Sequence, residues 1–222
     1  MLTIGTHNLH DRDGIPTFFA DVIGFTEAVP ARIQARKAAR WAKARARLVG
    51  FLIVVCSHQR DLVMALRRWH YKVTDTRYVP VHGGVAKVTP HRGTFVVETV
   101  RRVGKLRRAK GRREVFILSH RINAAFPPFI RGEATFRAEK WRDHTEVDES
   151  LARKYLAAGW VVHAMGDWNT PRGVDGMLAL PYEAGRGFDR IASSEPLRCV
   201  EVLDRKGSDH HRLRAMMDDR KA

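Results

Sequence analysis

Cysteine is scarce in this chain, and no apolar stretch is long enough to cross a membrane. The two cysteines, Cys56 and Cys199, stand in no CxxC or Cys/His spacing, which argues against a disulfide scaffold and a cysteine-ligated metal. The apolar run over residues 48–56 is far shorter than the roughly 20 residues of a transmembrane helix. No secretory signal is visible at the N-terminus. We therefore expect a soluble, intracellular, cytoplasmic protein with no membrane insertion and no obligatory protein partner.

Acidic residues are also in the minority. The chain has 24 Asp+Glu against 40 Lys+Arg, a formal net charge of +16. Such an excess favours polyanionic partners, with nucleic acid first and anionic membrane second. Residues 28–60 contain no acid, and basic residues recur there at three- and four-residue steps, which predicts a helix with a basic stripe. Residues 101–113 hold eight Lys/Arg and predict a basic hairpin loop.

These two runs supply the candidate nucleic-acid contacts, although each is also compatible with a solvated surface that binds nothing. The candidates are Arg32, Arg36, Arg40 and Lys43 in the stripe, and Arg107, Arg108, Arg112 and Arg113 in the loop.

Internal repeats, heptads, low-complexity tracts and convincing linkers are absent, so residues 1–222 are expected to form a single domain. Strand-like and helix-like patterns alternate, which indicates an α/β fold. Strands are expected at residues 1–8, 22–25, 51–56, 94–100, 114–120, 160–165, 188–192 and 213–217, and helices at 61–69 and 133–158. A glycine-rich connection is expected over residues 173–187.

Polar side chains stand at or beside the ends of many predicted strands. Taken singly, each has an ordinary structural explanation: Asn8 as a turn residue, Glu27 as an exposed acid, His120 as a hydrogen-bonded histidine. Together they point to one sheet edge that carries hard oxygen ligands for Mg²⁺ and imidazoles for proton transfer. The set comprises Asn8, Glu27, His120, Asp167, Asn169, Asp189, Asp209 and His210.

The same residues, in this order, resemble the endonuclease/exonuclease/phosphatase superfamily, the DNase I-like fold. The resemblance is carried by Thr-His-Asn8, Phe-Thr-Glu27, Leu-Ser-His120, Gly-Asp-Trp-Asn169, Phe-Asp-Arg-Ile191 and Ser-Asp-His210. It implies a four-layer α/β sandwich, in which two packed mixed β-sheets are flanked by helices, with a metal-dependent phosphoesterase site at one end.

The resemblance also implies roles. Glu27 and Asn8, with Asp209 sharing, would hold Mg²⁺ or Mn²⁺. Asp167 would orient or deprotonate the attacking water, and Asn169 would grip a phosphate oxygen. His210, oriented by Asp189, would be the general acid/base, and His120 the second histidine near the leaving oxygen. No acid that supports His120 is evident; Glu98 is a candidate.

The function that follows is a divalent-metal-dependent nuclease of low sequence specificity, with DNA preferred to RNA as the substrate. Two alternatives remain open. One is a phosphatase or phosphodiesterase for a small phosphorylated molecule or an inositol lipid; the other is a non-catalytic nucleic-acid-binding module that keeps a vestigial site.

Overall fold

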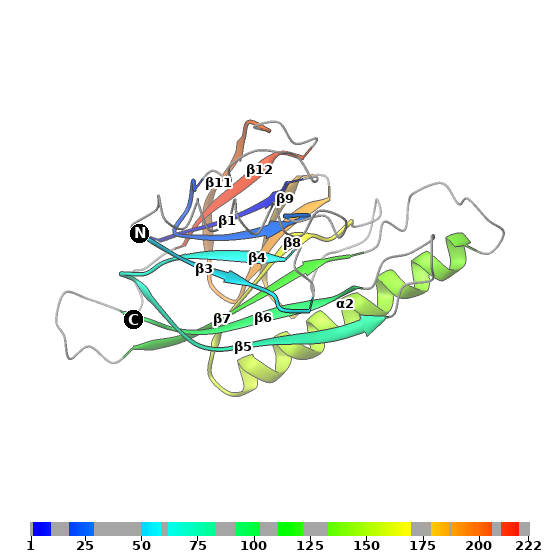
Figure 1. Ribbon diagram of the computed structural model, residues 1–222, viewed down its shortest axis with the longest axis horizontal. Coiled ribbons are helices and arrows are strands. Elements are labelled where there is room, and N and C mark those ends of the chain that lie inside the picture. The colour runs from blue at the N-terminus through cyan, green and yellow to red at the C-terminus, as the bar shows by residue number, and fades with distance from the viewer. Residues whose placement is uncertain are drawn as a thin grey trace.

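In the part of the chain that the structure describes, two β-sheets pack face to face and a long helix lies along the outer face of the second (Figure 1). This arrangement is seen in a computed structural model of the chain. The structure describes residues 2–9, 18–28, 50–58, 62–82, 92–102, 111–121, 133–169, 179–186, 188–205 and 210–217.

The first sheet has six strands in the order β11-β12-β1-β2-β4-β3. Their bounds are β1 Leu2–Asn8, β2 Val22–Thr26, β3 Phe51–Val55, β4 Val63–Arg67, β11 Leu197–Leu203 and β12 Arg212–Met217. The second sheet also has six, in the order β5-β6-β7-β8-β10-β9. Their bounds are β5 Tyr71–His82, β6 Arg92–Arg101, β7 Arg112–His120, β8 Val161–Asp167, β9 Tyr182–Arg186 and β10 Asp189–Ser193. Both sheets are mixed, because β1–β2 and β7–β8 are parallel pairs among antiparallel ones.

The main core lies between the two sheets, because alternate residues of each strand point to opposite faces. Ile4, Val22 and Met64 from the first sheet meet Phe116 and Met165 from the second, all fully buried. A second apolar cluster lies between β5–β8 and the helix α2, Glu133–Ala157, and a third covers the outer face of the first sheet. The parallel pairs in the middle of each sheet are therefore fixed on both faces.

All eight predicted strands and the helix at 133–158 are confirmed within a few residues. The helix predicted for residues 61–69 is wrong: Val63–Arg67 is strand β4. Leu62, Met64 and Leu66 face the main core while Val63 and Ala65 face the outer cluster, so both faces are apolar. A short apolar run buried on both faces has no period that separates strand from helix.

The flanking helices of the expected sandwich are represented, among the described residues, by α2 alone. The predicted helical stripe with Arg32, Arg36, Arg40 and Lys43 lies outside the described residues. So do Arg107 and Arg108 of the predicted basic loop. Arg112 and Arg113 are the first two residues of β7 and do not belong to a loop, which corrects that part of the expectation. The glycine-rich connection likewise contains a strand, β9.

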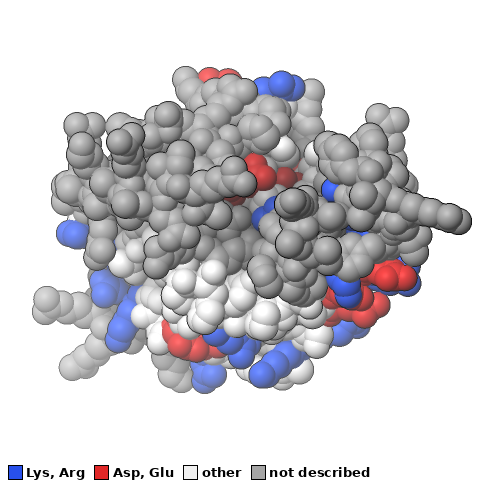
Figure 2. Space-filling model, turned by 45° about the vertical axis from the view of Figure 1, so that its right-hand side comes forward, with Lys and Arg blue, Asp and Glu red and all other residues white. Residues whose placement is uncertain are grey.

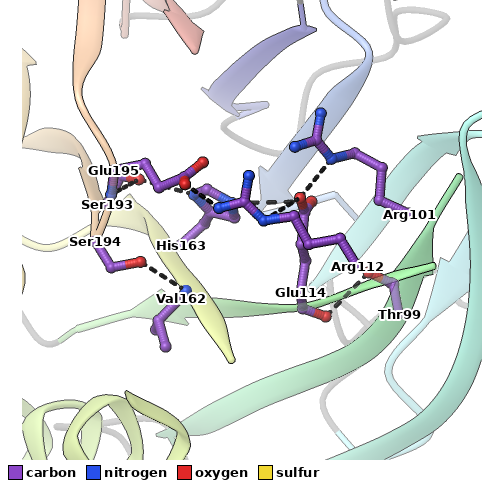
Figure 3. A network of polar contacts seen from close by, with 9 residues as sticks. All are labelled: Thr99, Arg101, Arg112, Glu114, Val162, His163, Ser193, Ser194 and Glu195. Atoms are coloured by element: carbon purple, nitrogen blue, oxygen red, sulfur yellow. Dashed lines mark hydrogen bonds and ion pairs between the residues drawn. The ribbon is translucent and has the colours of Figure 1, made fainter. Parts of the chain in front are cut away.

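A buried polar network closes the end of the second sheet where β7 begins (Figure 3). Glu114 and His163 are fully buried. Arg101 Nε donates to Glu114 Oε1 at 2.5 Å, and Arg112 Nε lies 3.9 Å from the same oxygen. The Nδ1 of His163 lies 3.0 Å from Ser193 Oγ. Ionic and polar pairing from four strands therefore holds this end of the sheet together.

The histidine of this network should make the protein sensitive to acid. Burial, followed by the charges of Arg101 and Arg112, lowers the pKa of His163 from 6.5 to about 3. The unfolded chain takes up this proton below about pH 6.5 and the folded chain does not, so stability present above that pH is lost on acidification. Urea unfolding at pH 7.5 and pH 5 should show wild type losing about 2 kcal/mol more than a His163→Gln variant. Equal losses of unfolding free energy in the two proteins would contradict this role of His163.

Candidate active site

Parallel strand pairing brings the predicted site residues to one end of the two sheets. In the second sheet β7 and β8 run parallel with His120 opposite Asp167. Gly166 stands opposite Ser119, and a Cβ there would lie 1.9 Å from the Ser119 carbonyl oxygen. The φ of Gly166 is 139°, which side-chain-bearing residues rarely adopt. Glycine before Asp167 is thus required for the two strand ends to meet.

Asp167 is at the centre of the cluster and is buried. Its Oδ2 accepts a hydrogen bond from Asn8 Nδ2 at 2.9 Å and lies 3.6 Å from His120 Nε2 and 4.0 Å from His210 Nε2. Its Oδ1 accepts from the Asn169 backbone N at 3.1 Å. The first sheet thus supplies Asn8, and the second sheet supplies the carboxylate that Asn8 holds.

His210 and Asp189 form a close pair beside Asp167. The Nδ1 of His210 lies 2.8 Å from Asp189 Oδ2, which leaves Nε2 directed towards Asp167. Burial raises the pKa of Asp189 from 3.8 to about 6; the hydrogen bond from His210 opposes the rise and the Asp167 charge adds to it. The pairing fixes the imidazole so that Nε2 is the nitrogen open to a reacting group.

His120 is buried and stands between two carboxylates and a guanidinium. Its Nε2 lies 3.5 Å from Glu27 Oε1, and its Nδ1 lies 2.6 Å from Arg92 Nη1. We expected an acid to support His120, but the side chain that contacts its Nδ1 is an arginine, Arg92. Glu98, the candidate for that acid, instead accepts from the Tyr155 hydroxyl. Arg92 was missed because a single arginine at the start of a strand has no distinguishing pattern.

Asn169 is held in place by the backbone at the end of β7. Its φ of 46° lies in the left-handed region, which asparagine tolerates better than most residues. Its Nδ2 donates to the Arg121 carbonyl at 2.8 Å. The Arg121 guanidinium is fully buried, donates to Asp148 of α2 at 2.9 Å, and lies 4.5 Å above the Trp168 ring. Arg121 and Asp148 were not singled out from the sequence, although Arg121 directly follows His120.

Asp167, Asp189 and His210 each place one ligand atom within 4.8 Å of the others, which makes them a possible metal site. The donor set fits a divalent cation: two carboxylates and an imidazole bind Mg²⁺, Mn²⁺ or Zn²⁺. Asp189 Oδ1 is buried and has no hydrogen-bond partner among the described residues, so it has capacity for a ligand. Asn8 and Glu27 lie beside this cluster, and Asp209, the third predicted ligand, lies outside the described residues. Figure 2 shows acidic side chains next to basic ones in a hollow of the surface.

Comparison with known proteins gives no match to a family model and none to a curated protein sequence. Solved structures do match. An endonuclease/exonuclease/phosphatase family protein from Bacteroides thetaiotaomicron is 11% identical over 96% of this chain and 93% of its own, with a TM-score of 0.66. The fold is decided by this agreement along the chain. This protein has the endonuclease/exonuclease/phosphatase fold.

Two further structures share it. TDP2 from D. rerio, solved with a single-strand DNA product, is 15% identical over 96% of this chain and 97% of its own, with a TM-score of 0.58. A mannosyl-6-phosphatase from B. thetaiotaomicron is 10% identical over 98% of this chain and 100% of its own, with a TM-score of 0.64. The resemblance read from the sequence is thus confirmed for the fold. These two proteins of the same fold take chemically different substrates.

No helix in the described part of the chain is long and apolar enough to span a membrane.

Proposed function

We propose that this protein is a divalent-metal-dependent phosphodiesterase that hydrolyses nucleic acid, with DNA preferred to RNA and little sequence specificity. The observation that supports the chemistry is the convergence of Asn8, His120 and His210 on one buried carboxylate, Asp167. These groups come from separate strands whose ends meet at one edge, as a rigidly held hydrolytic site requires.

Glu27, with Asn8 and Asp209, would hold the metal in the arrangement expected from the motifs, in which Asp167, Asp189 and His210 keep their roles in proton transfer. A metal bound by Asp167, Asp189 and His210 is the alternative, and it would replace those roles. When bound, Mg²⁺ or Mn²⁺ supplies positive charge against a phosphate oxygen and a water of lowered pKa. The protein groups then have separate tasks. Asp167 accepts a proton from, or orients, the water that attacks phosphorus, and the Asn169 amide donates to a non-bridging oxygen.

Proton balance at the leaving oxygen involves the two histidines. As water adds to phosphorus and the P–O bond to the leaving group breaks, that oxygen must gain a proton or be stabilised as an anion. His210 Nε2, held by Asp189 through Nδ1, is placed to exchange a proton there. His120 Nε2 and the nearby Arg92 guanidinium supply hydrogen-bond donors and positive charge beside it.

The preference for nucleic acid is supported by charge. A net charge of +16 favours a polyanion over a single small phosphate. The phosphatase alternative deserves a direct comparison, because a mannosyl-6-phosphatase has the same fold.

We expect purified protein to cleave plasmid and single-stranded oligonucleotides with Mg²⁺ or Mn²⁺. Cleavage should stop in EDTA and recover when excess metal is added. Gel electrophoresis of the products, run beside phosphate release from sugar phosphates and inositol phosphates, is the measurement. Cleavage that persists in EDTA would refute the metal requirement. Turnover of the small phosphates alone would replace the nuclease by the phosphatase, and no turnover of any substrate would leave a binding module.

A further inference from the structure

The end of the molecule opposite the candidate active site carries an exposed tryptophan and arginines that form no ion pair with an acid in the part of the chain that the structure describes. The turn between β4 and β5 presents Trp69, 52% exposed, and places the Arg68 guanidinium 4.3 Å above its indole ring. The Arg68 backbone N donates to the Gly50 carbonyl at 3.0 Å, and the Arg102 backbone N donates to the His70 carbonyl at 2.7 Å. The turn therefore joins both sheets and is fixed at each side.

A second arginine–tryptophan pair stands at this end, with a half-buried tryptophan. Arg113, exposed near the start of β7, lies with its guanidinium 5.6 Å from the ring of Trp160, just before β8. Aromatic faces stack with nucleic-acid bases of any sequence, and arginine adds phosphate contacts and cation–π attraction.

Three acids at this end already pair with other arginines. Arg67 pairs with Asp21 at 3.3 Å. Figure 3 shows the other two pairs, Arg101 with the buried Glu114 at 2.5 Å and Arg112 with Glu195. No ion pair joins Arg68, Arg102 or Arg113 to an acidic side chain among the described residues. The charge of these three arginines is available to a ligand, while the ion pairs of the other arginines stabilise the strand ends beside them.

The distance to the site follows from strand geometry. Arg113 and His120 lie near opposite ends of β7, seven residues apart, which is roughly 23 Å at 3.3 Å per residue. The path from Glu27 through the β2–β4 pair to Arg68 has a similar length, because Phe25 is opposite Val63 and β4 runs away from the site. A strand that rises about 3.4 Å per nucleotide needs roughly seven nucleotides to cover this distance.

We propose that Arg68–Trp69, with Arg102 and Arg113, forms a second contact surface for single-stranded nucleic acid, separate from the catalytic end. The inference rests on the proposed function for the identity of the polymer. One strand held at both ends would make affinity depend on its length, which is the property that the test uses.

The test measures fluorescence anisotropy of labelled oligothymidylates of 3 and 12 nucleotides, with Mg²⁺ and with phosphorothioate linkages that resist hydrolysis. Wild type, Arg68→Ala, Trp69→Ala and an Arg142→Ala control are compared; Arg142 is an exposed arginine of α2. Arg68→Ala and Trp69→Ala should each bind the 12-mer about 10-fold more weakly than wild type does, which is the size of effect expected for the loss of one stacked base. The 3-mer and the control should not change.

Two results would overturn the proposal of a second contact surface. One is a 12-mer affinity that neither variant changes; the other is an equal loss of affinity for the 3-mer and the 12-mer. Duplex DNA that bound as tightly as the single strand, with the same loss, would overturn the stacking role of Trp69. Failure of the catalytic proposal gives a different pattern, because hydrolysis would be absent in wild type while the binding difference remained. Circular dichroism and an unchanged rate on a small phosphodiester show that the variants are folded.

Discussion

Asp167→Asn should reduce phosphodiester hydrolysis by at least about 10³-fold while leaving the protein folded. The Asp167 carboxylate accepts from Asn8 Nδ2 and from the Asn169 backbone N, and two imidazoles approach it within 4.0 Å. The amide has one acceptor oxygen instead of two, so one of these donors faces an NH₂ group. The substitution removes the charge and one of the two acceptor oxygens without changing the volume.

The measurement is kcat on bis(4-nitrophenyl) phosphate with saturating Mg²⁺, beside Asp75→Asn as the matched control. Asp75 is an exposed carboxylate on β5, and removing its charge should change kcat less than about 2-fold. A variant that kept more than a tenth of wild-type kcat would exclude Asp167 from the chemistry. Urea unfolding of both variants separates a catalytic loss from a folding loss.

The part of the site that was predictable from the sequence is the part at the ends of central strands. Asn8, His120 and Asp167 are each the last residue of a strand buried on both faces, so the apolar run and its polar last residue are both visible. The gathering of these ends at one edge then follows from parallel pairing. Arg92 and the Arg121–Asp148 pair have no such marker, since their roles depend on contacts between elements distant in sequence.

Three strands for which the sequence showed no pattern lie at sheet edges, whereas the apolar run of β4 was visible but was assigned to a helix. β5 and β9 are the two edges of the second sheet, and β11 is an edge of the first. β11 alternates exposed and half-buried residues and has a bulge at Cys199, whose φ is 46°. An edge strand buries less apolar surface and follows its neighbour through backbone hydrogen bonds, which leave no trace in composition. Predictable strands were those that fill the core, and the others were specified by pairing.

His210→Gln should reduce kcat by about 10²–10⁴-fold. Asp189→Asn should also reduce kcat, because Asp189 orients the His210 imidazole. Asp189 accepts the hydrogen on His210 Nδ1 at 2.8 Å, which leaves Nε2 for the reacting oxygens. An asparagine at 189 can offer an NH₂ group to Nδ1 and stabilise the opposite tautomer. Because both substitutions disable one unit, the double variant should be no slower than His210→Gln alone.

The pH profile distinguishes this orienting role from a purely structural one. Burial raises the pKa of Asp189 to about 6, so the carboxyl becomes protonated and loses its acceptor as the pH falls below that value. Wild-type kcat/KM should therefore fall on the acid side of about pH 6, and Asp189→Asn should lose that limb of the profile. His70→Gln, at the opposite end of the molecule, should keep wild-type rate and profile. If the two substitutions instead multiplied in the double variant, His210 and Asp189 would act independently, and the 2.8 Å contact would have no part in catalysis.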